Sequence, residues 1–285
     1  ENVKNIKNEN IKIIKCDFKD ITKLENLDND YNLKILPKTE YGNFEVIRHK
    51  INFGVNDNFY FRPFYIELHD NNLFLINHEG KILHSMLKNI INDQNYKIEN
   101  SFVKSNFNGN SILGTLVKEN ELFISHLRKN EKCNNFYISK GKISTNEIKF
   151  KNLFKSEECV DGLQAGRMID FTFNKKKGIL LSIGGEGWDD PTLKPQERSS
   201  IVGKTLFIED DGSYQIFSKG HRSPQGLTYF KNNIVLTEHG PDGGDEINKI
   251  EFDKNYGWPL ASYGRHYSEI KKKNENPYFK DHKNN

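Results

Sequence analysis

Between His221 and Tyr267 the chain carries three dense groups of charged, amide, glycine and proline residues, HRSPQGL, EHGPDGGDEIN and NYGWPLASYG. Arg222 offers a planar fork of donors that suits a carboxylate, and Gln225 offers both a donor and an acceptor. Gly240 and Pro241 follow a short apolar run, where their carbonyl oxygens can turn away from a strand ladder. Fixed carbonyl oxygens suit a hard cation such as Ca²⁺. These residues together predict a site for an anionic ligand held against a divalent cation.

The alternative is a set of tight turns without a ligand. In that interpretation the Asp and Gly residues serve only turn geometry, and Arg222 pairs with an acidic neighbour. For any one of the three motifs alone this alternative is favoured. All three in this order favour a site, because surface loops rarely combine so many Gly, Pro, Asp and Trp residues without one.

The motifs resemble those of the glucose/sorbosone dehydrogenase family, the soluble sugar dehydrogenases that use pyrroloquinoline quinone (PQQ). The resemblance is specific over roughly Leu163–Tyr267. It implies a six-bladed β-propeller with PQQ and Ca²⁺ on top of the ring. It also implies that Arg222 and Gln225 line the cofactor with His239 beside it. The carbonyls that would bind Ca²⁺ are those of Gly240 and Pro241.

A second stretch, Gly162–Asp190, resembles the family's segment that reads His-x-Gly-Gly-Arg, then a strand, then a Gly-rich loop. Arg167 takes the place of the family's arginine, so the resemblance adds it to the expected cofactor-binding residues. Four residues before it, the position of the family's catalytic histidine holds Leu163. Leucine cannot accept a proton. The catalytic base is therefore unknown, with His239 and Asp161 as candidates.

The resemblance implies PQQ-dependent oxidation of an aldose sugar at its anomeric carbon. A base takes the proton of the anomeric hydroxyl while hydride moves to the quinone, and an external acceptor takes the electrons. Ca²⁺ and Arg222 would stabilise charge on the quinone oxygen. The alternative is a non-catalytic propeller that binds a glycan or a protein partner, and Leu163 favours it. The intact motifs favour the enzyme, because unneeded loop motifs would be free to drift.

Four similar apolar runs recur along the chain: LFLI from Leu73, LFIS from Leu122, ILLS from Ile179 and IVLT from Ile234. Each follows a polar turn and has another apolar strand before that turn, such as FYIEL at Phe64–Leu68. This pattern of hairpins predicts an all-β propeller of four-stranded blades over residues 51–285. The spacing leaves room for roughly five blades, short of a full six-bladed ring. Residues 1–50 are expected to form a polar N-terminal segment, either irregular or a partial blade.

The composition, 35% hydrophobic and 28% charged residues, predicts a globular chain, and no apolar run is long enough to span a bilayer. The net charge of +3 is too small to indicate a nucleic-acid partner. Three scattered cysteines without a C-x-x-C pair argue against zinc, and they leave one disulfide or three free thiols open. The resemblance implies a periplasmic or secreted protein, and the oligomeric state is open.

Overall fold

The computed structural model describes residues 38–39, 42–43, 64–92, 102–160, 165–185, 192–264 and 280–281. The chain forms two compact units, Glu1–Val55 with Ser85–Ser101, and Asn56–His84 with Phe102–Asn285. In the first unit, β1 (Lys38–Thr39) pairs with β2 (Gly42–Asn43), and α1 spans Leu87–Asn92. The boundary predicted near residue 50 lies outside the described residues and stays a prediction. None of the helices in the described ranges is long and apolar enough to cross a membrane.

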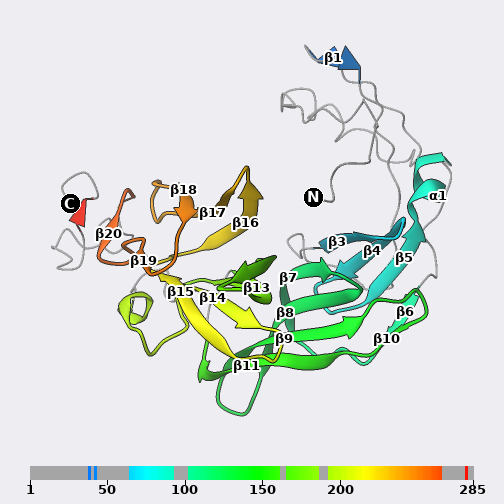
Figure 1. Ribbon diagram of the computed structural model, residues 1–285, viewed down its shortest axis with the longest axis horizontal. Helices are drawn as coiled ribbons and strands as arrows, with labels where there is room; N and C mark the ends of the chain where they lie inside the picture. Colours follow the sequence, from blue (N-terminus) through cyan, green and yellow to red (C-terminus); the bar gives the residue numbers. More distant parts are fainter. Residues whose placement is uncertain are drawn as a thin grey trace. The chain divides into compact units, whose positions relative to one another are not determined.

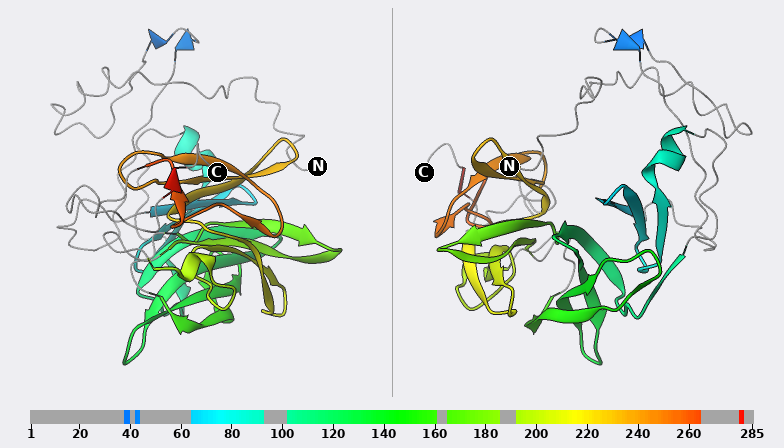
Figure 2. Two further views of the ribbon diagram at one scale, coloured as in Figure 1. Left: turned by 90° about the vertical axis from the view of Figure 1, so that its left-hand side faces the viewer. Right: turned by 45° about the vertical axis from the view of Figure 1, so that its right-hand side comes forward.

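The second unit is a β-propeller with four blades in the described residues (Figures 1 and 2). In each blade, successive strands pair antiparallel. The first blade contains β3 (Phe64–His69), β4 (Asn72–Asn77), β5 (Ile82–Met86) and β6 (Phe102–Ser105). The second contains β7 (Ser111–Lys118), β8 (Glu121–Lys129), β9 (Asn134–Lys142) and β11 (Lys151–Cys159). The third contains β12 (Met168–Phe173), β13 (Lys176–Ile183), β14 (Lys204–Glu209) and β15 (Tyr214–Lys219), and the fourth β16 (Pro224–Phe230), β17 (Asn233–Glu238) and β18 (Glu246–Ile250).

The four apolar runs occupy equivalent strands, so the predicted repeat is confirmed. They lie in β4, β8, β13 and β17, which are the second strands of four separate blades. The turns before the runs in β4 and β13 are two-residue turns at the predicted polar residues. Asp70 and Asn71 between β3 and β4 have φ of 46° and 60°, and Asn174 and Lys175 between β12 and β13 have φ of 49° and 67°. Two-residue turns with positive φ match the twist of a hairpin.

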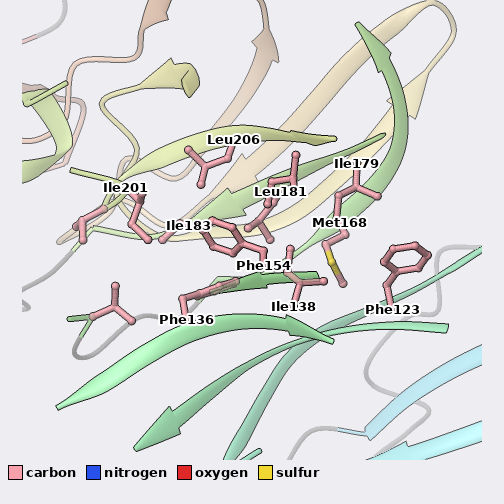
Figure 3. Packing of buried hydrophobic residues seen from close by; sticks show 13 residues of the cluster. Phe123, Phe136, Ile138, Phe154, Met168, Ile179, Leu181, Ile183, Ile201 and Leu206 are labelled. Atoms are coloured by element: carbon pink, nitrogen blue, oxygen red, sulfur yellow. The ribbon is translucent and has the colours of Figure 1, made fainter. Parts of the chain in front are cut away.

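The apolar runs are continuous because an interior blade buries both faces of its sheet. On β13, Ile179 and Leu181 pack against the second blade, whereas Leu180 between them packs against the fourth. Figure 3 shows the first of these contacts, with Phe136, Ile138 and Phe154 of the second blade facing residues of the third. A strand covered on both faces has no polar side, and this explains runs such as ILLS.

Short strands close the outer edges of two blades. β10 (Glu147–Ile148) pairs in parallel with β6 of the first blade, although it follows β9 of the second. In the same way, β19 (Lys254–Asn255) follows the fourth blade and pairs in parallel with β15 of the third. An edge strand presents unpaired backbone groups, and these short strands satisfy them.

A disulfide joins Cys133, in the connection between β8 and β9, to Cys159 at the end of β11. The two residues are 26 apart in the sequence, and their Cα atoms are 5.8 Å apart. The structure thus decides between the two alternatives that the sequence left open for these two cysteines.

Reduction of this disulfide, or the double substitution Cys133→Ser with Cys159→Ser, should lower the free energy of unfolding by about 2–4 kcal/mol, because the unfolded chain gains freedom. Urea denaturation with and without reductant measures the loss. Peptide mapping under non-reducing conditions should recover the two cysteines in one linked fragment. Free thiols at both Cys133 and Cys159 in the folded oxidised protein would contradict the assignment.

His126 on β8 is fully buried inside the second blade. Its Nε2 lies 2.9 Å from the Ser139 hydroxyl, and its ring stacks on Tyr137. Burial lowers the pKa of His126 from 6.5 to about 4. Between these two pH values the unfolded chain binds a proton that the folded chain excludes. The stability that depends on neutral His126 is therefore complete above pH 6.5 and is lost as the pH falls to about 4.

The shift from 6.5 to about 4 predicts that His126 alone removes about 3 kcal/mol from the free energy of unfolding between pH 7 and pH 4. His126→Gln keeps a donor near Ser139 but cannot become charged, so its stability should fall less steeply with acid. Denaturant titrations across this pH range compare the two proteins. Parallel curves for both would show that His126 does not carry the acid sensitivity.

Candidate functional site

The three sequence motifs meet at one small recess of about 10 Å³. Each motif contributes to its wall, as their shared chemistry predicts. A recess of this size cannot enclose a cofactor, for which pockets of about 300 Å³ or more are usual. A ligand would instead lie against it. The lining residues are Gly220, Arg222, Glu238, His239, Gly240, Glu246, Tyr256, Trp258, Ala261 and Ser262.

Arg222 is fixed between the second and third motifs. Its Nη1 donates to the carbonyl oxygens of His239, at 3.0 Å, and Gly240, at 2.8 Å. The guanidinium carbon lies 5.3 Å from the centre of the Trp258 ring, within the range of a cation–π contact. The structure therefore brings Arg222, His239 and Gly240 together.

Below Arg222 lies a buried pair that joins the first two motifs. His221 Nδ1 is 3.0 Å from Glu238 Oε1, and the two side chains are 0% and 4% exposed. Glu238 also accepts hydrogen bonds from the backbone N–H of Arg222, at 2.7 Å, and from Asn248 Nδ2, at 2.8 Å. Burial by itself would raise the pKa of Glu238, but the charge of His221 and these hydrogen bonds hold the pKa below its usual value. Glu238 is therefore a carboxylate.

The predicted cofactor-binding residues Arg167 and Gln225 form a second group. Arg167, which directly precedes β12, donates from Nε to the carbonyl oxygen of Gln225 on β16 at 2.8 Å. Its guanidinium carbon also lies 5.7 Å from the ring centre of Tyr65 on β3. The side chain of Gln225 donates to the Ser223 hydroxyl at 3.1 Å. Arg167 thus contacts the first strands of the first and fourth blades.

The loop after β17 is closely packed. The Gly240 N–H donates to Asp245 Oδ1 at 3.0 Å, and Pro241 is buried. A Cβ at Gly240 would meet the carbonyl oxygens of Gly243 and Gly244, whereas a Cβ at Gly243 would meet nothing within 4 Å. Glycine at position 240 is therefore required by the approach of the backbone. The loop presents the Gly240 carbonyl to Arg222 as a consequence.

His239, a candidate base, is 58% exposed in its side chain, and its Nδ1 lies 3.6 Å from Asp245 Oδ2. The other candidate, Asp161, and the leucine at the expected base position, Leu163, lie outside the described residues. The roles predicted for all of these residues stay predictions.

For Ca²⁺, the donor type fits. In the part of the chain that the structure describes, no group of three or more His, Cys, Asp or Glu residues could hold a metal ion. An ion here would need backbone carbonyls and oxygens of a bound ligand. The Gly240 carbonyl already accepts one hydrogen bond from Arg222, but a carbonyl oxygen has a second lone pair. Gly240 can therefore serve both the arginine and a cation.

Sequence reasoning assigned no role to His221, Glu238 and Trp258, although all three stand inside the motifs. One signal was available for Glu238. It directly follows the apolar run IVLT, which places its charge at the end of a half-buried strand. A charge in such a place needs a partner, and His221 in the preceding motif is that partner.

The model of the Glucose / Sorbosone dehydrogenase family matches residues 66–283. The chain belongs to this family, and the resemblance that the motifs indicated is confirmed. It is 39% identical over 111 residues to the aldose sugar dehydrogenase YliI of Escherichia coli K12 and 38% identical over 130 residues to the quinoprotein glucose dehydrogenase B of Acinetobacter calcoaceticus. These matches cover 33% and 35% of this chain and 29% and 27% of the relatives. The matched segments thus span less than a third of either relative.

The fold is also similar to two crystal structures. The soluble aldose sugar dehydrogenase of Escherichia coli in the apo-form has a TM-score of 0.59 and 21% identity, over 77% of this chain and 68% of that chain. A glucose dehydrogenase has a TM-score of 0.59 and 21% identity, over 76% of this chain and 67% of that chain. At this identity the likeness supports the fold.

Gly240→Ala should lower the free energy of unfolding by about 1–3 kcal/mol, because the methyl group forces the packed loop apart. Gly243→Asn in the same loop is the control. Nothing lies within 4 Å of a Cβ there, and asparagine tolerates the positive φ of 80°. The larger side chain at position 243 should therefore cost less than the methyl at position 240. Equal losses in denaturant titrations would contradict the packing argument.

Proposed function

We propose that this chain binds PQQ together with Ca²⁺ and oxidises an aldose sugar at its anomeric carbon. The observation that carries the proposal is the Arg222 guanidinium bonded to the carbonyls of His239 and Gly240 where the three motifs meet. Membership of the Glucose / Sorbosone dehydrogenase family supports it. So do the names of the two relatives, a quinoprotein glucose dehydrogenase and an aldose sugar dehydrogenase.

The quinone cofactor would supply the acceptor for a hydride. The protein's part is to bind and orient it. Arg222 brings a permanent positive charge and donors in a fixed plane, which suit a carboxylate or a quinone oxygen. The carbonyls of Gly240 and Pro241 are hard oxygen ligands that suit Ca²⁺. Gln225 and Arg167 complete the proposed set of cofactor-binding residues.

The proton of the sugar hydroxyl needs a base, and Leu163 cannot provide one. Of the two candidates, His239 has a carboxylate neighbour in Asp245, 3.6 Å away. Such a partner stabilises the imidazolium that forms when histidine takes a proton. Arg222 also contacts the carbonyl of His239 itself. We therefore favour His239 over Asp161 as the base.

We further propose a periplasmic or secreted location and an external acceptor for the electrons. The disulfide between Cys133 and Cys159 supports the location, because disulfides persist in oxidising compartments and are rare in the cytosol.

Titration calorimetry of the protein with PQQ in the presence of Ca²⁺ tests the binding. Arg222→Ala should weaken PQQ binding at least about tenfold, because hydrogen bonds to a charged group contribute about 1.5–3 kcal/mol. Lys177→Ala, at the exposed start of β13, is a control. An aldose-dependent dye-reduction assay then tests turnover. Failure of the natural protein to bind PQQ with Ca²⁺ would end the proposal and favour a propeller that binds a glycan or a protein.

Leu163→His should raise the rate of dye reduction while leaving PQQ affinity nearly unchanged, because general-base catalysis typically contributes about 10²–10⁴-fold. Binding depends on Arg222 and the neighbouring carbonyls, and neither needs the base. A natural protein that already turns over rapidly, and loses that rate in His239→Gln, would show that His239 replaces the missing histidine fully, and Leu163→His would then bring no gain.

A further inference from the structure

Both carboxylate oxygens of Glu238 are used within the protein. Oε2 accepts the hydrogen bond from the backbone N–H of Arg222, and Oε1 accepts from Asn248 and lies 3.0 Å from His221 Nδ1. A side chain only 4% exposed presents almost no surface to a ligand. Its effect on a ligand must therefore pass through the groups that it holds.

Those groups form a closed circuit around the candidate site. The Glu238 carboxylate holds the main chain of Arg222, and the Arg222 guanidinium in turn holds the carbonyls of the two residues that follow Glu238. The His239 N–H donates to the Ser223 carbonyl at 3.0 Å, which adds a backbone hydrogen bond between the same two segments. The position of the guanidinium is thus set from its main-chain end by one carboxylate.

His221 extends the circuit into the third blade. Its Nε2 is 2.7 Å from the Ser218 hydroxyl on β15, which is 2.6 Å from the Thr205 hydroxyl on β14. Its ring stacks on Tyr256 with centres 4.8 Å apart. Because β14 and β15 are central and outer strands of a packed sheet, this end of the circuit is rigid. Glu238 therefore connects the loop that follows β17 to a fixed frame.

We propose that Glu238, held by His221, is a positioning residue that sets the Arg222 guanidinium and the Gly240 carbonyl in place for an anionic cofactor and its cation. The inference rests on the proposed function for the identity of that cofactor. A purely structural role would make Glu238 important for folding but not specifically for Arg222, and the experiment separates the two.

The test is a double-mutant cycle on PQQ affinity in the presence of Ca²⁺, using Glu238→Gln, Arg222→Ala and both together. Glutamine presents an amide N–H₂ to neighbours that need an acceptor, so it breaks the circuit at nearly constant volume. Glu158→Gln is the matched control. Glu158, on β11 of the second blade, likewise accepts from a backbone N–H, that of Ile201, and it also accepts from the Ser200 hydroxyl.

Glu238→Gln should weaken PQQ binding by about 10–100-fold, the effect typical of residues that orient a ligating group. In the Arg222→Ala background the same change should add little, because its effect passes through the guanidinium. Glu158→Gln should lower thermal stability and leave PQQ affinity unchanged. Additive losses in the cycle, or an equal loss of affinity in the control, would overturn the positioning role.

His221→Phe, which keeps a ring against Tyr256, serves if Glu238→Gln does not fold, and the same non-additivity with Arg222→Ala is expected. Amide hydrogen exchange tests the geometry without any ligand. Loss of the carboxylate should raise exchange at Arg222 and at 239–240 but not in β8. Unchanged exchange at those amides would overturn the inference. If the natural protein does not bind PQQ but the variant shows raised exchange, the proposed function is wrong. The hydrogen-bonded circuit through Glu238 is then still supported.

Discussion

An interior blade of this propeller has a neighbour on each face, and that constraint governs most of the chain. Both faces of a strand such as β13 must be apolar, so neighbouring side chains alternate between two cores rather than between core and solvent. Polar groups are then confined to the turns and strand ends, unless a partner is supplied. Lys118, at the end of β7, shows such a partner. It is buried at 6% exposure, and its ammonium donates to the Gly178 carbonyl and to Asp210 of the third blade.

The candidate site lies at the ends of the strands, where polar groups are allowed. β17 delivers Glu238 into the interior and His239 and Gly240 to the surface within three residues. The connection into β16 does the converse, with buried His221 directly before Arg222. The buried pair of His221 and Glu238 thus sets the spacing of two half-buried groups, Arg222 and Gly240. The arrangement explains why charged and glycine residues are so densely interleaved here. Gly240 allows a close backbone approach, Arg222 faces the recess, and Glu238 anchors it.

The sequence predicts the strands well because their signals are local. Apolar runs of four residues and polar two-residue turns decide the hairpins, and residues of the three motifs line one recess. It could not predict contacts that depend on distant segments. Nothing in the spacing of three cysteines selects Cys133 and Cys159 over other pairs, and nothing in Glu147 and Ile148 announces a parallel strand on another blade. The partner of Glu238 is likewise defined only by the register of β16 against β17.

The two parallel edge strands have a consequence for the order in which the molecule can be assembled. β6 receives its outer neighbour from β10, and β15 receives its own from β19, so in both cases the completing strand is translated after most of the next blade. Neither sheet can complete its outer edge until the next blade has been synthesised. Until then, each sheet has an exposed edge strand that can pair with strands of other chains. A chaperone that shields nascent strands would therefore matter most during the translation of residues 106–146 and 220–253.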